Sequence, residues 1–132
     1  MANMKILLIL LLSININARL TPKRIKIYEC VDQRDDTMVD RVFLYSSTLG
    51  QKHFYEAEVW PNKVLYPKLK SKWYRLNLST MYNNHVLTFA RGRFRIKIQK
   101  TLPVEHKYKA SAYIPDFQIH TSKWYCKEYK TN

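Results

Sequence analysis

Apolar and polar residues alternate along much of this chain, which is the pattern of strands with one buried face. The clearest example is the segment 93–98, where Phe94, Ile96 and Ile98 fall on one face and three basic residues fall on the other. The same period of two recurs elsewhere, with Pro, Asn or Gly at the breaks between segments. It predicts strands over 24–28, 54–60, 72–78, 86–90, 93–99 and 107–114.

One segment has a helical period instead. Asp35 or Asp36 can cap a helix here, and Gly50 stands at the position where helices stop. The apolar stripe of this segment comprises Met38, Val39, Val42, Phe43 and Tyr45. We therefore predict an α+β fold, in which a single helix packs on an antiparallel sheet.

The first 18 residues have the features of a secretion signal. Lys5 gives a positive start, an apolar stretch covers 6–12, and the small residue Ala18 precedes the expected cleavage point. Cleavage there leaves residues 19–132 as a single domain. The apolar stretch is shorter than the roughly 20 residues that a membrane span needs, and no later segment reaches that length. We expect a secreted monomer without a membrane span.

The two cysteines, Cys30 and Cys126, lie near the two ends of the mature chain. In an oxidising compartment they are expected to form a disulfide. Closing so long a loop removes denatured-state entropy and stabilises the fold by roughly 4 to 5 kcal/mol. A disulfide also withholds the thiolate, so neither cysteine is expected to act as a nucleophile.

Basic residues are concentrated in the second part of the chain. The formal net charge is +13, yet residues 19–58 contain seven basic and seven acidic side chains and are neutral. Residues 59–132 contain 15 basic side chains and three acidic ones. Such a surface attracts nucleic acid, acidic lipid headgroups or acidic proteins. Composition does not choose among these partners, and a basic surface that serves only solubility is the alternative.

A binding face follows from the strand pattern. The outward sides of 93–99 and 107–114 carry basic side chains beside a tyrosine, and 72–78 extends this face if the strands align. Phosphates would meet Arg and Lys there, and bases would stack on aromatic rings. The predicted nucleic-acid-binding residues are Trp73, Arg75, Arg93, Arg95, Lys97, Lys109 and Tyr113. A solvated sheet face of the same composition is the alternative.

Asn77-Leu78-Ser79 is an N-glycosylation sequon, which is consistent with secretion. A glycan on Asn77 would argue against nucleic-acid binding if this residue lies on the ligand face. An unused sequon is the alternative.

The motif Tyr28-Glu29-Cys30 behind a signal peptide, together with the late Cys126, resembles the RNase-like secreted effectors of powdery mildew fungi. The resemblance spans the mature chain, and its motifs are short. It implies a fold similar to that of fungal guanyl-specific ribonucleases, with a helix across a curved antiparallel sheet and a disulfide joining the termini. It also implies delivery into plant cells, where members bind host targets, dampen defence and are in some cases recognised by immune receptors.

The ribonuclease resemblance makes catalysis a hypothesis to test. Such enzymes need a base, an acid and cations around the phosphate. Arg95 occupies a position resembling the family's arginine, but Arg75 stands where a glutamate is expected, and 109–115 contains no histidine. The resemblance therefore implies a ribonuclease-like protein without the catalytic Glu and His.

Other groups do not supply a catalytic or metal site. Glu56 and Glu58 form either a carboxylate pair or, as the alternative, a solvated strand face. With only Gly50 and Gly92, the chain has no glycine-rich phosphate loop. The histidines are dispersed, without the spacing of zinc ligands, at His53, His85, His106 and His120. We expect no metal and no cofactor.

The sequence thus predicts a non-enzymatic secreted effector that binds host RNA, host proteins or both, and that a host immune receptor can recognise. Two alternatives belong to other classes. One is an active secreted ribonuclease, and the other is a cationic lipid-binding or antimicrobial β protein.

Overall fold

A computed structural model describes residues 21–34 and 36–130, with the backbone alone at 102–104. The predicted secretion signal, 1–18, and the candidate cap Asp35 lie outside the described residues. Among the described residues, no helix is long and apolar enough to cross a membrane.

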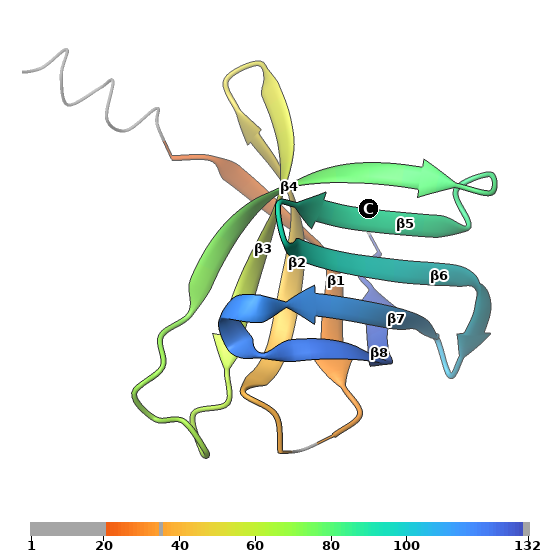
Figure 1. Ribbon diagram of the computed structural model, residues 1–132. Helices are drawn as coiled ribbons and strands as arrows, with labels where there is room; N and C mark the ends of the chain where they lie inside the picture. Colours follow the sequence, from red (N-terminus) through yellow and green to blue (C-terminus); the bar gives the residue numbers. More distant parts are fainter. Residues whose placement is uncertain (1–20, 35, 131–132) are drawn as a thin grey trace, which may run out of the picture.

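Eight antiparallel strands close into a barrel in which each strand pairs with the next and the last pairs with the first (Figure 1). A short 3-10 turn, η1 (Pro115–Phe117), precedes the last strand. The strands are β1 (Lys23–Asp32), β2 (Val39–Leu49), β3 (Lys52–Pro61), β4 (Lys72–Met81), β5 (Val86–Arg91), β6 (Phe94–Val104), β7 (Lys107–Ile114) and β8 (Ile119–Glu128). The six strands predicted from the period of two all occur in this order, as β1 and β3 to β7.

The predicted α+β fold, and with it the ribonuclease-like arrangement, is wrong. The segment expected to be a helix is β2, and within residues 21–34 and 36–130 the only helical turn is η1. Val42 and Leu44 point into the barrel, while Phe43 and Tyr45 are buried on its outer side under other side chains. Because both faces of β2 are covered, its apolar residues form a continuous run that a helical stripe also matches. Gly50, expected to end a helix, lies with φ at +62° in the turn between β2 and β3.

The sequence pattern also missed β8. Its pairing with β7 shifts register between Ala110 and Ala112, where Trp124 and Thr121 are the opposite residues. This bulge places Ser122 and Lys123 out of step with the ladder, so that the apolar residues of β8 do not alternate evenly. The strand period in the sequence is lost for that reason.

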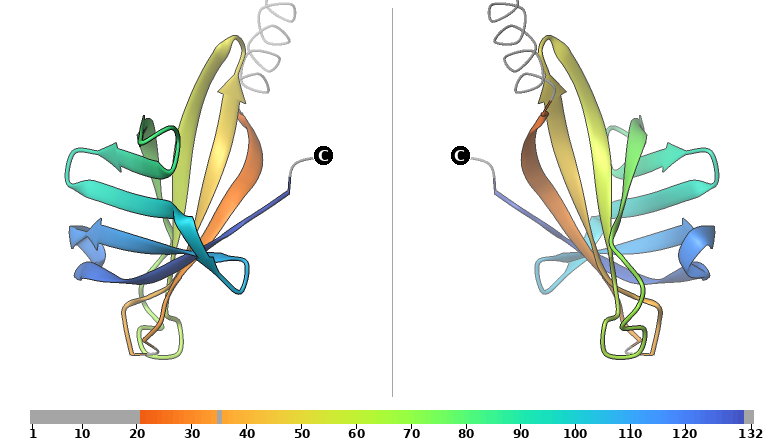
Figure 2. Two further views of the ribbon diagram at one scale, coloured as in Figure 1. Left: turned by 90° about the vertical axis from the view of Figure 1, so that its right-hand side faces the viewer. Right: turned by 90° about the vertical axis from the view of Figure 1, so that its left-hand side faces the viewer.

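The two halves of the barrel run in different directions. Figure 2 shows β1 to β3 as one group of strands and β5 to β8 as a second group that crosses it. β4 connects them, since its residues 72–76 pair with β3 and its residues 77–81 pair with β5. Large apolar side chains fill the interior between the two groups, including Leu44, Leu76, Phe89, Ile96, Ile98, Ile114 and Trp124.

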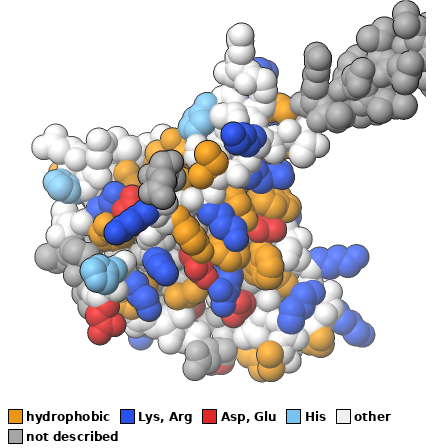
Figure 3. All heavy atoms as spheres, turned by 180° about the vertical axis from the view of Figure 1, so that it is seen from behind, with side chains coloured by type: hydrophobic (Ala, Val, Ile, Leu, Met, Phe, Trp, Pro, Cys, Tyr) orange, Lys and Arg blue, Asp and Glu red, His pale blue; other side chains and the backbone are white. Residues whose placement is uncertain are grey.

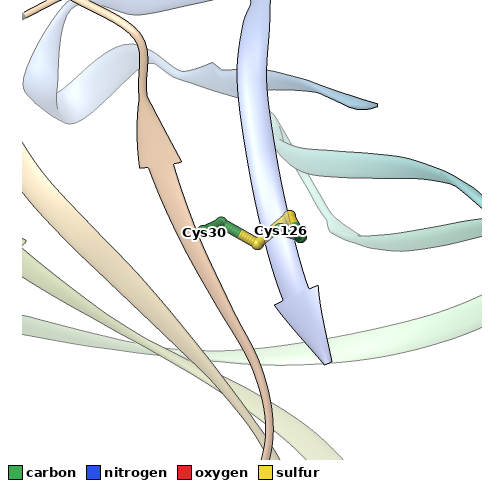
Figure 4. The surroundings of a disulfide bond; sticks show 2 residues. All are labelled: Cys30 and Cys126. Atoms are coloured by element: carbon green, nitrogen blue, oxygen red, sulfur yellow. A yellow bond between two sulfur atoms is a disulfide. The ribbon is translucent and has the colours of Figure 1, made fainter. Parts of the chain in front are cut away.

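The predicted disulfide is confirmed. Cys30 and Cys126 are directly opposite each other in the β1–β8 pair and are joined by an S–S bond of 2.06 Å (Figure 4). Both residues are fully buried. The bond therefore fastens the first strand to the last at the seam where the barrel closes.

Candidate functional site

The outer side of β6 and β7 is the most basic part of the barrel wall. Phe94, Ile96 and Ile98 lie in the core, as the alternation predicted, so the intervening Arg95 and Lys97 point outward. On β7, Ala110, Ala112 and Ile114 are buried, and Lys109 and Tyr113 take the outward positions. The sequence pattern therefore placed both faces of these two strands correctly.

Strand register brings the outward residues into rows across the wall. Arg95 is opposite Tyr113, which in turn is opposite His120 of β8. The rings of Tyr113 and His120 are in edge contact, with centroids 5.2 Å apart. Lys109 follows Ser111 by two residue pairs in the β6–β7 pairing. It extends the basic surface toward the turn between these two strands.

A groove of about 940 Å³ opens on this side of the barrel, above the bulge in β8. Three cationic side chains, two aromatic rings and three aliphatic hydroxyl groups lie along it, and none of its lining residues is acidic. We call it the basic groove, and it is lined by Gly92, Arg93, Arg95, Ser111, Ala112, Tyr113, His120, Thr121, Ser122 and Lys123. Cations and stacking rings in one open groove suit a ligand that carries both phosphates and bases.

The cations of this surface are not neutralised within the described part of the chain. The ion pairs there engage other basic residues, namely Arg24, Arg34, Arg41, Lys72 and Lys100. Arg93, Arg95, Lys97, Lys109 and Lys123 take part in none of those pairs. Their positive charge is therefore available to an external anion.

Of the predicted site residues, Lys97 and Lys109 lie beside the basic groove on β6 and β7. Two others, Trp73 and Arg75, lie away from it. They belong to the half of β4 that pairs with β3, whereas Asn77 in the other half is opposite Ala90, which is opposite Arg95. The expected alignment of all three residues on one ligand face is wrong because β4 changes partner midway. Asn77 alone reaches the row that contains Arg95.

Trp73 instead belongs to a packed layer on the outside of β1 to β4. The Arg24 guanidinium lies 4.2 Å from the Trp73 ring centre, and the Tyr45 ring lies 5.2 Å away. In the same way Arg75 lies 4.0 Å from the Phe54 ring centre. Figure 3 shows this mixture of hydrophobic, basic and acidic side chains on the face seen from behind.

The two glutamates considered as a carboxylate pair hold this outer layer together. Glu56 is buried and accepts hydrogen bonds from Arg24 Nε over 2.9 Å and from Ser47 Oγ over 2.7 Å. Glu58 accepts a hydrogen bond from the Tyr45 hydroxyl over 2.9 Å. Burial, together with this bond to Glu58, raises the pKa of Tyr45. Both carboxylates thus accept hydrogen bonds within this outer layer.

The histidines lie in different places. His53 is 2.7 Å from Ser46 Oγ on the β2–β3 hairpin, and His85 and His106 lie in the turns after β4 and β6. Within the described ranges, no three His, Cys, Asp or Glu side chains come together as a metal site. Only His120 joins the basic groove.

The residues that sequence reasoning missed are those that β8 contributes. His120, Thr121, Ser122 and Lys123 line the basic groove, but their strand was not recognised. The signal that points to them is Trp124 and Cys126, two apolar residues at strand spacing beside the expected disulfide. No family model, curated protein or solved structure matches this chain.

Proposed function

We propose that this protein is a secreted, non-enzymatic binding protein that holds single-stranded RNA along the basic groove and the adjoining outer face of β6 and β7. The observation that supports it most is the set of five cations without ion pairs, Arg93, Arg95, Lys97, Lys109 and Lys123, beside the ring of Tyr113. Cations that follow the backbone and rings that stack bases are the two components of single-strand binding.

Each group has a distinct part in this binding. Arg95 and Arg93 donate hydrogen bonds to phosphate oxygens, and an arginine fork suits this geometry better than a lysine. Tyr113, which is 38% exposed, offers a ring face to a base. Hydroxyl groups of Ser111, Thr121 and Ser122 are placed for further polar contacts. Such contacts tolerate many base sequences, because phosphates and ring faces are common to all of them.

Binding without cleavage is the second part of the proposal. Attack of a ribose hydroxyl on the adjacent phosphate needs a base for the nucleophile and an acid for the leaving oxygen. Among the lining residues of the basic groove, His120 is the single imidazole, and no carboxylate accompanies it. The groove therefore favours retention of an intact strand.

The biological setting rests on the sequence resemblance alone. The ribonuclease-like fold that it implied has been corrected, so its support is the secretion signal, Tyr28-Glu29-Cys30 and Cys126. On that basis we propose that the protein acts as an effector in plant cells, with host RNA as the ligand. Binding of a host protein or recognition by a host immune receptor is the alternative for the same basic surface.

The test is binding of the oxidised mature protein to a labelled single-stranded RNA, followed by fluorescence anisotropy and by the integrity of the RNA on a gel. The variant Arg95→Glu/Lys97→Glu reverses two charges of the site. The matched control is Lys23→Glu/Lys52→Glu, which makes the same change in net charge at exposed positions on β1 and β3.

The site variant is expected to lose at least tenfold in affinity, about 1.4 kcal/mol, and the control is expected to lose much less. Equal losses would show that net charge rather than the basic groove controls binding, and would contradict the proposal. Degradation of the RNA by the wild type, abolished by His120→Ala, would overturn its non-enzymatic part.

A further inference from the structure

The segment 62–71, between β3 and β4, carries the most exposed aliphatic side chain of the described part of the chain. Val64 is 91% exposed, Leu65 is 50% exposed and Tyr66 is 38% exposed. In Figure 1 this segment projects beyond the end of the barrel at the lower left. We call it the β3–β4 tip.

Hydrogen bonds fix this tip with its apolar side chains outward. The Asn62 side-chain oxygen accepts hydrogen bonds from the backbone amides of Val64 and Leu65 over 3.2 and 3.3 Å. The Tyr66 amide donates to the Asn62 carbonyl over 2.8 Å, and the Asn62 amide donates to the Met38 carbonyl over 2.7 Å. The exposure is thus a feature of an ordered turn that is tied to the neighbouring connection between β1 and β2.

The charged side chains of the tip itself are all cationic. The segment 62–71 contains three lysines, Lys63, Lys68 and Lys70, all exposed, and no acidic residue. Lys63 donates a hydrogen bond to the Leu69 carbonyl, which leaves its charge without an anionic partner. A partner surface that fits these three positive charges is anionic.

Two half-exposed tryptophans flank the tip on the outer side of the barrel. Trp60 is the last residue but one of β3 and is 44% exposed, and Trp73 is the second residue of β4 and is 41% exposed. Aliphatic and lysine side chains share the tip, and the tryptophans lie on the strands that flank it, as suits a bilayer surface. Aliphatic groups enter the acyl boundary, and tryptophan and lysine lie at the level of the headgroups.

We propose that the β3–β4 tip docks the protein on an anionic lipid surface, with Val64 and Leu65 entering the headgroup region and the three lysines contacting lipid phosphates. A cationic and apolar tip that projects from the barrel fits a flat anionic membrane. This contact is separate from RNA binding, since Val64 and Leu65 take no part in the basic groove.

Vesicle binding tests the proposal with the intact oxidised protein. Sedimentation would compare phosphatidylcholine vesicles with and without phosphatidylserine, for the wild type and for Val64→Ser/Leu65→Ser. The matched control is Met81→Ser/Tyr82→Ser, which removes two apolar side chains of similar exposure, 55% and 72%, from the β4–β5 hairpin. Lys63→Gln/Lys68→Gln/Lys70→Gln tests the charge.

We expect binding only to the vesicles that contain phosphatidylserine, at least a tenfold loss for the tip variant, a similar loss for the lysine variant and no loss for the hairpin control. Tryptophan emission should shift to shorter wavelength on binding, because Trp60 and Trp73 enter a less polar layer. Equal binding of the tip variant and the wild type would overturn the proposal. So would a loss confined to Arg95→Glu/Lys97→Glu, which would assign the lipid contact to the outer face of β6 and β7.

Discussion

The indole Nε1 of Trp124 donates a hydrogen bond to Asp32 Oδ2 over 2.9 Å, across the seam where β8 closes the barrel against β1. The Asp32 side chain is 1% exposed, and Arg34 donates to both of its carboxylate oxygens. Burial by itself would raise the pKa of Asp32, but the hydrogen bonds from Arg34 and Trp124 outweigh it and lower the pKa. The ionised carboxylate is therefore the form that the folded protein favours.

Replacement of this carboxylate should lower stability in a way that depends on pH. Because the pKa of Asp32 is lower in the folded state, its contribution is present above its ordinary pKa of 3.8 and is lost as pH falls through the folded value. We expect Asp32→Asn to reduce the free energy of unfolding by about 1.5 to 3 kcal/mol at neutral pH. The difference from the wild type should shrink as the pH falls below 3.8 and through the lower pKa of the folded state.

Urea unfolding at neutral and acid pH measures this difference. Asp40→Asn is the control, since Asp40 pairs with Arg41 at the surface, where its side chain is 52% exposed. Its effect should stay below about 1 kcal/mol. An equal loss for Asp32→Asn at both pH values would contradict the assigned pKa shift.

The disulfide should account for a large share of the stability of the barrel. Cys30 and Cys126 are separated by 96 positions in the sequence, and the seam between β1 and β8 closes the barrel. We expect Cys30→Ala/Cys126→Ala to lose about 4 to 5 kcal/mol of unfolding free energy, because the unfolded chain is no longer constrained. Guanidinium unfolding checks this value. The wild type under reducing agent should lose a similar amount, and a loss below about 1 kcal/mol would contradict the prediction.

Two aromatic residues predicted to bind bases should behave differently. Trp73 packs between Arg24 and Tyr45, so Trp73→Ala should lower the free energy of unfolding by about 1 to 2 kcal/mol and leave RNA affinity unchanged. Tyr113 lines the basic groove, so Tyr113→Ala should weaken RNA binding by about 1 to 3 kcal/mol. Thermal unfolding and RNA anisotropy on both variants separate the two effects. Loss of RNA affinity in Trp73→Ala would restore Trp73 to the site.

The positions and the two faces of β6 and β7 could be predicted from the sequence, because apolar and polar residues alternate regularly along both strands. Phe94, Ile96 and Ile98 are in the core and Arg95 and Lys97 outside it, as the period of two requires. β2 could not be recognised in this way. Phe43 and Tyr45 are buried outside the barrel under Lys26 and the tryptophans, so both faces of the strand are apolar and the period disappears.

The candidate site was predicted in part for a related reason. Arg93, Arg95 and Tyr113 lie on the basic groove because β6 and β7 are neighbours both in sequence and in space. The groove residues of β8 are positioned by a bulge in that strand. Trp73 lies outside the groove because β4 changes its pairing partner midway. The bulge breaks the period of two within β8, so the strand is not recognised from its sequence. The change of partner leaves the period of β4 intact, so the period does not reveal it.

The salt dependence of RNA binding reports how many of the cations contact phosphates. If Arg93, Arg95, Lys97, Lys109 and Lys123 all do so, the logarithm of the association constant should fall against the logarithm of salt concentration with a slope of about −3.5. Arg95→Gln should reduce the steepness by about 0.7. Anisotropy titrations between about 50 and 200 mM salt give the slope, and Lys52→Gln, on the β2–β3 hairpin, serves as the control. A slope near zero would contradict phosphate contact.

Glycosylation at Asn77 should compete with RNA binding. Asn77 is exposed on β4 and is opposite Ala90 of β5, which in turn is opposite Arg95 of β6. The Asn77 and Arg95 side chains therefore lie on one outer surface, about 10 Å apart. A glycan at this position would occupy the space above the row that contains Arg95. We expect protein that carries the glycan to bind RNA at least tenfold more weakly than the same protein after enzymatic removal of the glycan.

The variant Ser79→Ala provides the matched control, because it abolishes the sequon and keeps the Asn77 side chain. Produced in a glycosylating host, it should bind RNA as the deglycosylated wild type does. If the glycosylated and deglycosylated proteins bind RNA with equal affinity, the strand does not cross this part of the wall. In that case the ligand is confined to the side of the basic groove formed by β7 and β8, where Tyr113, His120 and Lys123 lie.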